Sequence, residues 1–410
     1  MGKYGESPLS LLDPLPTSIP ASQLYAALID ALPDPILVVT GLDRDDLTGR
    51  RYILANAAAR ELLRITAEEG MLLSAVRDPE VLAAVDRALF DETDSEGFYE
   101  TTGAQTRSLR VRARSLGRGL DGTRLALLTF HDETEVRRVE RTRVDFLANA
   151  SHELRTPLAS LSGFIETLRG HARDDVAARD KFLGIMQAQA DRMARLIADL
   201  TSLSRIELDE HVAPKGVVDL VLLVGEVVEA AAPLGAQRRI SLDWRPCGAG
   251  KVFVRGERDQ IVQVVQNLLD NAIKYSPDGA AVRIELQSGL TDLAAAASPE
   301  GVPRLSLVAP DPSAETYAAL RIVDLGPGIA RQNLPRLSER FYRVDGQKSG
   351  ARSGTGLGLA IVKHIMNRHR GGLVVASAEG EGSTFTAYFP MANAPDGVPG
   401  GLPGGVVKAS

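Results

Sequence analysis

The sequence predicts a multidomain α+β protein with three folded segments between two flexible ends. Residues 21–133 mix short helical patterns with strands of period two, and residues 134–208 carry a helical heptad pattern with almost no strand signal. Residues 214–391 alternate strand and helix patterns and hold three glycine clusters. A chain of 410 residues is long enough for two or three domains of ordinary size.

Composition excludes several classes of protein. The 47 basic and 53 acidic residues give a net charge of −6, so no large basic field is available and no nucleic-acid partner is expected. The single cysteine, Cys247, excludes a disulfide framework and a cysteine-based zinc site. No apolar run approaches the roughly 18 uncharged residues of a membrane span, and the first residues do not resemble a signal peptide. We therefore expect a cytoplasmic protein, unless a partner or an upstream segment supplies a membrane anchor.

The first segment, 21–133, predicts a small domain with an antiparallel sheet. A helix is expected in LYAALIDAL, a strand in ILVVT, and a strand followed by a helix in RYILANAAARELL. Apolar and polar residues alternate in RSLRVRARSL and TRLALLTFHD, which is typical of half-buried strands. Residues 1–20, with four prolines, predict a flexible leader, and residues 392–410 predict a disordered tail.

The second segment, 134–208, predicts two long amphipathic helices. Apolar or small residues recur at three-four spacing from Val144 to Leu168 and again from Leu183 to Leu200, with Gly170 and Asp174-Asp175 suited to the turn between them. A hairpin of this kind cannot bury its apolar stripe alone. We expect it to pair with a second copy as a four-helix bundle, which makes the protein a homodimer. The stretch from Glu133 to Phe146 is expected to continue the first helix upstream.

The first of these helices carries a candidate phosphoryl acceptor. His152 follows the seam position Ser151 and should face outward, with Glu153 beside it and Thr156 one turn further along. A solvated imidazole can accept a phosphoryl group if a carboxylate fixes its tautomer. A His-Glu pair on a helix is more often only a solvated polar pair, and spacing alone favours that interpretation.

The third segment, 214–391, carries residues suited to a nucleotide. Asn267, Asn271 and Lys274 lie on one helical face, and two amides with a lysine suit a magnesium–polyphosphate group. A polar helix face would be about as probable if this motif stood alone. Asp324 ends a strand before two glycines, and Gly354-Thr355-Gly356-Leu357-Gly358 opens a helix whose N–H groups can bind phosphate. The spacing of a P-loop is absent.

Three such sites in one segment favour a nucleotide pocket over three unrelated turns. The stretch from Ser288 to Thr316 is rich in Ala, Pro and Ser and predicts a surface insertion between two strands.

These motifs resemble those of a known family. NASHELRTPL resembles the phospho-acceptor box of sensor histidine kinases of two-component systems, and NLLDNAIKY, DLGPGIA, ERFYRVD and GTGLGLAIVK are similar to the four boxes of their ATP-binding domain. The resemblance covers about residues 140–391 and is strongest to kinases of the phosphate-regulon sensor type. The first segment looks like a PAS sensory domain, with a D-x-T turn at Asp132-Glu133-Thr134.

The resemblance implies a fold and a set of roles. The fold would be a PAS-like α/β sensor, an antiparallel helical hairpin forming a dimeric four-helix bundle, and a two-layer α/β sandwich that binds ATP. His152 would be phosphorylated, Glu153 would activate it, Thr156 would position a water for dephosphorylation, and Asn271 would hold Mg²⁺. The residues implied at Mg-ATP are Asn267, Asn271, Lys274, Tyr275, Asp324, Gly326, Gly328, Arg343, Gly354, Thr355, Gly356, Leu357 and Gly358.

The implied function is an ATP-dependent protein-histidine kinase. It would autophosphorylate His152, transfer the phosphoryl group to an aspartate of a response regulator and act as the phosphatase of that regulator. The PAS-like segment would receive an unknown small-molecule or protein signal. Two other classes stay open: an ATPase of the same fold that drives clamping, and a ligand-sensing scaffold or phosphatase with residual kinase activity. Leu325 departs from the polar residue usual at its position.

Overall fold

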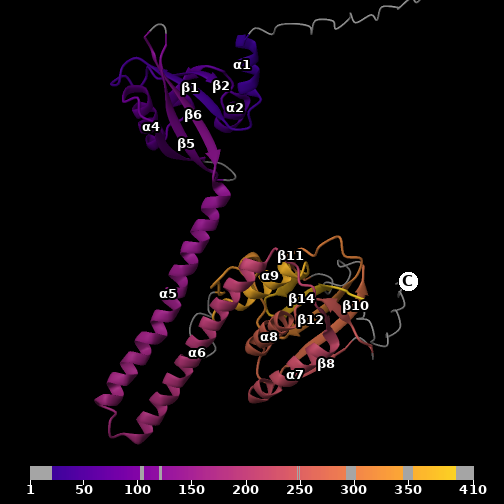
Figure 1. Cartoon of the computed structure of the whole chain (residues 1–410). Coiled ribbons are helices and arrows are strands. Elements are labelled where there is room, and N and C mark those ends of the chain that lie inside the picture. Colours follow the sequence, from indigo (N-terminus) through magenta and orange to yellow (C-terminus); the bar gives the residue numbers. More distant parts are fainter. Residues whose placement is uncertain are drawn as a thin grey trace, which may run out of the picture. The chain divides into compact units, whose positions relative to one another are not determined.

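The computed structural model describes residues 21–101, 106–119, 122–246, 248, 250–291, 302–344 and 354–393. The chain forms two compact units, Met1–Asp145 and Phe146–Ser410 (Figure 1). The predicted leader, 1–20, lies outside the described residues, as does the predicted tail, 392–410, apart from residues 392 and 393. The two units are described separately below.

The first unit is built on one six-stranded antiparallel sheet in the order β3-β2-β1-β6-β5-β4. Four helices accompany this sheet, and the first turns of α5 follow it. The elements are α1 (Ala21–Asp30), β1 (Ile36–Gly41), β2 (Arg51–Ala55), α2 (Ala57–Leu63), β3 (Gly70–Met71), α3 (Leu72–Ala75), α4 (Pro79–Phe90), β4 (Ser95–Glu100), β5 (Ser108–Arg118) and β6 (Arg124–Asp132).

The two strands predicted from alternating residues, β5 and β6, are neighbours within this sheet. Leu109 and Val111 of β5 and Leu128 and Phe130 of β6 are buried, while the residues between them are more exposed. The D-x-T turn ends β6, because the Asp132 carboxylate accepts a hydrogen bond from the backbone N–H of Thr134 at 2.9 Å. The hydroxyl of Thr134 in turn accepts from the Ser108 N–H at 3.0 Å, which fastens the turn to β5.

The second unit begins with a helical hairpin. Helix α5 (Thr134–Arg169) and helix α6 (Val176–Asp209) are separated by the predicted turn, and the Asp175 side chain caps α6. The single α5 also confirms the predicted helical continuation upstream of Phe146. Several large apolar side chains of the predicted stripe are exposed on the isolated chain. They are Val144, Leu147, Leu158, Ile165, Leu183 and Ile197.

The rest of the second unit is a two-layer α/β sandwich. Its six-stranded sheet has the order β11-β13-β14-β12-β10-β8, and β8 pairs in parallel with β10. Helices α7, α8 and α9 share one hydrophobic core with the sheet face that carries Leu320 and Ile322. The elements are β7 (Val217–Asp219), α7 (Leu220–Gln237), β8 (Ser241–Arg245), β9 (Phe253–Arg255), α8 (Arg258–Tyr275), β10 (Ala281–Leu290), β11 (Arg304–Val308), β12 (Tyr317–Asp324), the 3-10 helix η1 (Arg331–Arg336), α9 (Gly358–Arg368), β13 (Gly372–Ala378) and β14 (Gly382–Pro390).

The predicted surface insertion from Ser288 to Thr316 is partly wrong. Residues 304–308 form β11, which pairs with β13 at the edge of the sheet, and β10 extends to Leu290. The strand RLSLV does alternate polar and apolar residues, but it is only five residues long and lies in a stretch rich in Ala, Pro and Ser, whose composition favoured a loop. Residues 292–301 lie outside the described residues.

One helix of the described residues, α7, is long and apolar enough to cross a membrane by length and composition. The sequence prediction that no run approaches this length therefore needs qualification. Leu220, Leu223, Val224 and Val227 of α7 are buried in the core of the sandwich, which is an equally good reason for their apolar character.

Burial in the first unit leads to a stability prediction. Leu128 is fully buried at the centre of β6, so Leu128→Ala should lower the free energy of unfolding by about 2–4 kcal/mol through lost burial and a residual cavity. Leu116→Ala on the adjacent strand should cost less than about 0.5 kcal/mol, because that side chain is 51% exposed. Urea unfolding of both variants measures the difference, and equal losses would contradict the packing described here.

Candidate functional site

The second unit contains a cavity of about 470 Å³. Four of its walls are the polar face of α8, the turn after β12, the glycine-rich loop that leads into α9, and one face of α6. Residues of α7, of the segment 337–344 and of β14 complete the lining. Most of the residues singled out from the sequence meet in this cavity. They are Asn267, Asn271, Lys274, Tyr275, Asp324, Gly328, Arg343, Gly354, Thr355, Gly356 and Gly358.

Helix α8 supplies the first wall because it is strongly amphipathic. Its buried residues recur at three-four spacing and fix one face of the helix against the sheet. Asn267 and Asn271 therefore lie on the opposite face, toward the cavity. The Lys274 ammonium donates to the Tyr275 hydroxyl at 2.9 Å and lies over its ring, so both groups reach the cavity together.

Asp324 is the buried acceptor of the cavity. It ends β12, is only 5% exposed, and its carboxylate accepts a hydrogen bond from the Gly326 N–H at 2.8 Å. Burial raises the pKa of Asp324 to about 6, against the effect of the backbone N–H groups of Gly326 and Ser383. Gly328 adopts a φ of +68°, and a side chain there would meet the Ala378 carbonyl. Gly326 does not line the cavity, but its backbone N–H is bonded to Asp324, which does.

The loop before α9 supplies the third wall. The first turn of α9 has no side-chain cap, so its backbone N–H groups can bind an anion. Gly358 is required because a Cβ there would lie 2.8 Å from Oδ1 of Asn267. Leu357 differs from its neighbours: its side chain is fully buried, so it anchors the loop in the core and does not line the cavity.

The phospho-acceptor box lies on α5, outside the lining of this cavity. His152 and Thr156 are exposed, as expected, and the Thr156 hydroxyl donates to the His152 carbonyl at 3.2 Å. The Glu153 carboxylate is bonded to Arg192 of α6, Nη2 to Oε2, at 2.9 Å. The structure thus joins the box to α6 through Glu153.

Three family models match parts of the chain. They are "PAS domain" over residues 23–101, "His Kinase A (phospho-acceptor) domain" over 142–209, and "Histidine kinase-, DNA gyrase B-, and HSP90-like ATPase" over 256–393. The phosphate regulon sensor protein PhoR of Pseudomonas aeruginosa is 34% identical over 82% of this chain and 69% of its own length. The chain belongs to the sensor histidine kinases.

Other relatives of this kinase agree with the assignment. The sensor-like histidine kinase SenX3 of Mycolicibacterium smegmatis is 35% identical over 66% of this chain and 63% of that protein. SenX3 of Mycobacterium tuberculosis is 29% identical over 91% of this chain and 82% of that protein. Among solved structures, the Acinetobacter baumannii histidine kinase AdeS aligns with a TM-score of 0.41 and 26% identity over 59% of this chain and 98% of that one. The predicted family, fold class and ATP-dependent histidine kinase activity are confirmed by the domains and relatives.

Sequence reasoning missed the fourth wall of the kinase's cavity. Arg192, Arg195 and Asp199 line it from α6, and the Asp199 carboxylate accepts a hydrogen bond from the Thr355 hydroxyl at 2.8 Å. Burial raises the pKa of Asp199, against the opposing effects of Thr355 and Arg195. Their recurrence every three to four residues was the available signal, but it shows only that they share a face, not what that face meets.

Two residues of the ERFYRVD box have partners outside the cavity. Arg340 forms an ion pair with Glu207 of α6 at 2.6 Å, and the Phe341 ring lies 6.0 Å from the ring of Phe146. Arg343 of the same box does line the cavity.

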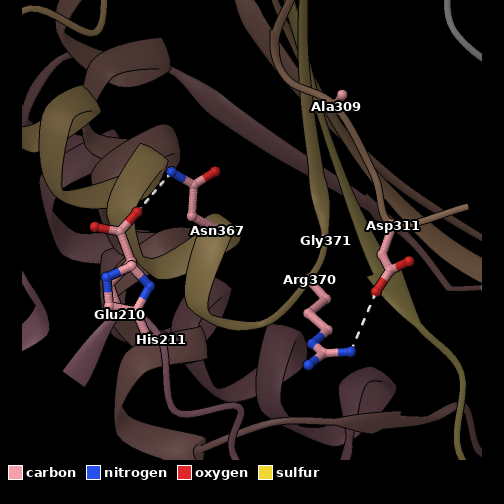
Figure 2. A pocket seen from close by; sticks show the side chains of 7 residues that line it. All are labelled: Glu210, His211, Ala309, Asp311, Asn367, Arg370 and Gly371. Carbon is pink, nitrogen blue, oxygen red and sulfur yellow. Dashed lines mark hydrogen bonds and ion pairs between the residues drawn. The ribbon is translucent and has the colours of Figure 1, made fainter. Parts of the chain in front are cut away.

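A second pocket of about 340 Å³ lies where the end of α6 meets the end of α9 (Figure 2). Its two carboxylates are already engaged: Glu210 accepts from the Asn367 amide at 2.7 Å, and Asp311 pairs with Arg370 at 3.4 Å. This pairing of the polar groups within the pocket favours a structural junction over a nucleotide site.

Asp324 leads to a pH prediction for the kinase. If its carboxylate accepts a hydrogen bond from the nucleotide base, protonation below a pKa of about 6 removes the acceptor and weakens binding. The Kd for ATP at about pH 5 should be roughly tenfold higher than at about pH 7.5. Equilibrium titration with a fluorescent ATP analogue measures it. Asp324→Asn, which cannot titrate, should bind more weakly at neutral pH and lose most of this pH dependence; an unchanged dependence would contradict the role of Asp324.

Proposed function

We propose that this kinase autophosphorylates His152 from Mg-ATP, passes the phosphoryl group to an aspartate of a response regulator, and also acts as the phosphatase of that regulator. The observation that carries the proposal is the pairing of two sites within one unit. One is a cavity with amides, a lysine, a buried carboxylate and a free helix N-terminus, and the other is an exposed histidine in an HELRT box. An ATPase that only drives clamping has no need of the second.

Each wall of the cavity suits one part of ATP. Asp324 lies at the buried end and is suited to accept a hydrogen bond from the adenine amino group. The N–H groups of the first turn of α9 and the Lys274 ammonium are suited to the phosphates. Tyr275 is suited to the ribose. Gly328 and Gly356 have positive φ and pack against the backbone of Ala378 and Phe341, so they fix the path of the two loops that line the cavity.

The residues of the cavity fit a magnesium ion that arrives with the nucleotide. Among the described residues, no group of three or more His, Cys, Asp or Glu side chains could hold a metal by itself. Asn271 and Asn267 offer amide oxygens on one face of α8, and Mg²⁺ prefers oxygen ligands completed by phosphates and water. Bound there, the ion would neutralise part of the phosphate charge.

The chemical step needs little covalent work from the protein. A lone pair of an imidazole nitrogen of His152 attacks the γ-phosphorus, the bond from that phosphorus to the bridging oxygen breaks, and its electron pair leaves with ADP. Glu153 holds the N–H on the other nitrogen of the ring, which keeps the attacking nitrogen unprotonated. Positioning supplies most of the acceleration, because the reacting groups lie on separate elements that must be brought into line.

The same box supports the exchange with a response regulator. His152 is exposed on α5, so the receiving aspartate of a partner can reach it. Thr156 is exposed one turn along the same face and carries a hydroxyl that can orient a water for the reverse, hydrolytic reaction. This phosphatase activity rests on Thr156 and Glu153.

Pairing of two chains completes the proposal. The exposed apolar stripe of α5 and α6 would be covered by the same stripe of a second copy, giving a four-helix bundle. We divide the chain into a PAS-like sensory domain, 21–133, a dimerisation and phosphotransfer hairpin, 134–208, and an ATP-binding domain, 214–391. The sensory domain would receive a small-molecule or protein signal.

Labelling with γ-labelled ATP tests the chemistry. The intact protein with Mg²⁺ should give a band whose label is lost in acid and survives alkali. His152→Ala should abolish the label through loss of the nucleophile, yet change the Kd for ATP less than about twofold, because His152 lies outside the cavity. Asn271→Ala should reduce labelling by at least about 100-fold through loss of the metal ligand. ATP hydrolysis without label would favour the clamping ATPase instead.

Light scattering tests the dimer. Leu158→Glu with Ile165→Glu should shift the mass of the protein in solution toward a single chain, because two charges would enter the buried seam. Leu222→Glu, at a 63% exposed leucine of α7 outside the stripe, should leave the dimer intact. A dimer that survives the double substitution would place the interface elsewhere.

A further inference from the structure

The side chain of Arg192 connects the acceptor box on α5 with the nucleotide cavity. It projects from α6, lines the nucleotide cavity and forms an ion pair with Glu153 of α5 at 2.9 Å. Glu153 is the neighbour of His152, so the guanidinium stands between the acceptor box and the nucleotide. Nothing in the sequence motifs assigns it a role.

The face of α6 that bears Arg192 lies along the phosphate end of the cavity. Asp199, two turns further along α6, is bonded to Thr355 of the glycine-rich loop. Arg195, between them, acts electrostatically on Asp270 of α8, the residue beside Asn271. The two interactions of α6, with Thr355 and with Asp270, therefore involve the loop suited to phosphate and the helix suited to the metal ion.

The chemistry of arginine suits such a position. A guanidinium carries several N–H donors in one rigid plane, so one edge can hold a carboxylate while another faces a phosphate. The Arg192 side chain is 27% exposed and that of Glu153 is 34% exposed. A pair this accessible contributes little to stability, so its placement calls for another explanation.

We propose that Arg192 is a positioning residue for phosphotransfer: it holds the Glu153 carboxylate beside His152 and presents the rest of its guanidinium to the triphosphate. Nucleotide occupancy is then communicated to the acceptor box through one side chain. The inference rests on the proposed autophosphorylation of His152, because it concerns how Glu153 is held for that reaction.

Initial rates of His152 labelling at varied ATP concentration test the proposal in the full-length chain. Arg192→Ala should lower kcat by about 10- to 100-fold and raise the Kd for a fluorescent ATP analogue about fivefold. Arg192→Lys keeps the charge but not the planar fork, so it should restore the Kd to within about twofold and leave kcat at least about tenfold low. A purely structural ion pair would show no such split.

Double variants show whether Arg192 acts through Glu153. At saturating ATP, the kcat of Glu153→Gln/Arg192→Ala should equal that of Glu153→Gln alone within about twofold, because the carboxylate that Arg192 holds beside His152 is already lost in Glu153→Gln. Arg195→Ala is the matched comparison. Arg195 lies on the same wall but donates to the Asp191 carbonyl and not to Glu153, so the fold-losses in kcat of Arg195→Ala and Glu153→Gln should multiply in the double variant. Arg179→Ala, at an exposed α6 arginine outside the cavity, should change neither the rate nor the Kd.

Two results would overturn the inference. One is an unchanged Kd in Arg192→Ala, and the other is a fold-loss in kcat of Glu153→Gln/Arg192→Ala that equals the product of the losses in the two single variants. The Kd measurement needs no phosphotransfer, so it tests the contact of Arg192 with the triphosphate even if Glu153→Gln gives no measurable labelling. Failure of the proposed function is distinct, since the unaltered protein would then give no acid-labile label dependent on His152.

Discussion

The amphipathic packing of α8 is the constraint on which the nucleotide cavity depends. Seven of its residues are buried, and their burial fixes which way the polar face points. Arg238 secures the end of the helix by donating to the backbone carbonyls of Lys274 and Ser276. With the axis and the end of α8 fixed, the amides and the lysine have one available direction, toward the glycine-rich loop.

Helix α6 has two functional faces because 3.6 residues per turn leave room for both. One face buries Leu196, Leu203 and Ile206 in the same core as the ATP-binding layer. The other leaves Leu183 and Ile197 exposed, where a second chain can cover them. In the proposed dimer, α6 would contact both the ATP-binding layer and the second chain, which places it well to make one responsive to the other.

Hydrogen bonds and ion pairs extend this joint along the length of α6. Thr355, Arg340 and His364 each contact a carboxylate of α6, namely Asp199, Glu207 and Glu210. Thr355 belongs to the glycine-rich loop proposed to bind the phosphates, so in that proposal nucleotide binding and the packing of this layer on α6 involve the same loop. Hydrogen bonds from His364 and Asn367 hold the pKa of Glu210 below its ordinary value, although burial opposes them.

The sequence by itself determined the class of the fold, the family and the residues most suited to ATP. Periodicity and glycine spacing are local properties, so the half-buried strands β5 and β6, the two long helices, and the faces of Asn267, Asn271 and His152 could all be predicted. The roles of these residues remain predictions. Strand β11, RLSLV, was missed because five alternating residues are a short signal within a stretch rich in Ala, Pro and Ser.

Only the tertiary structure decided what the faces meet. Arg192, Arg195 and Asp199 looked like an ordinary polar stripe, because an amphipathic pattern does not name its partner. Their position at the cavity depends on contacts across long stretches of chain, such as the 156 residues between Asp199 and Thr355. The pKa of Asp324 depends likewise on burial by distant elements. Periodicity can be recognised within one short stretch of sequence, whereas contacts between residues far apart in the chain cannot.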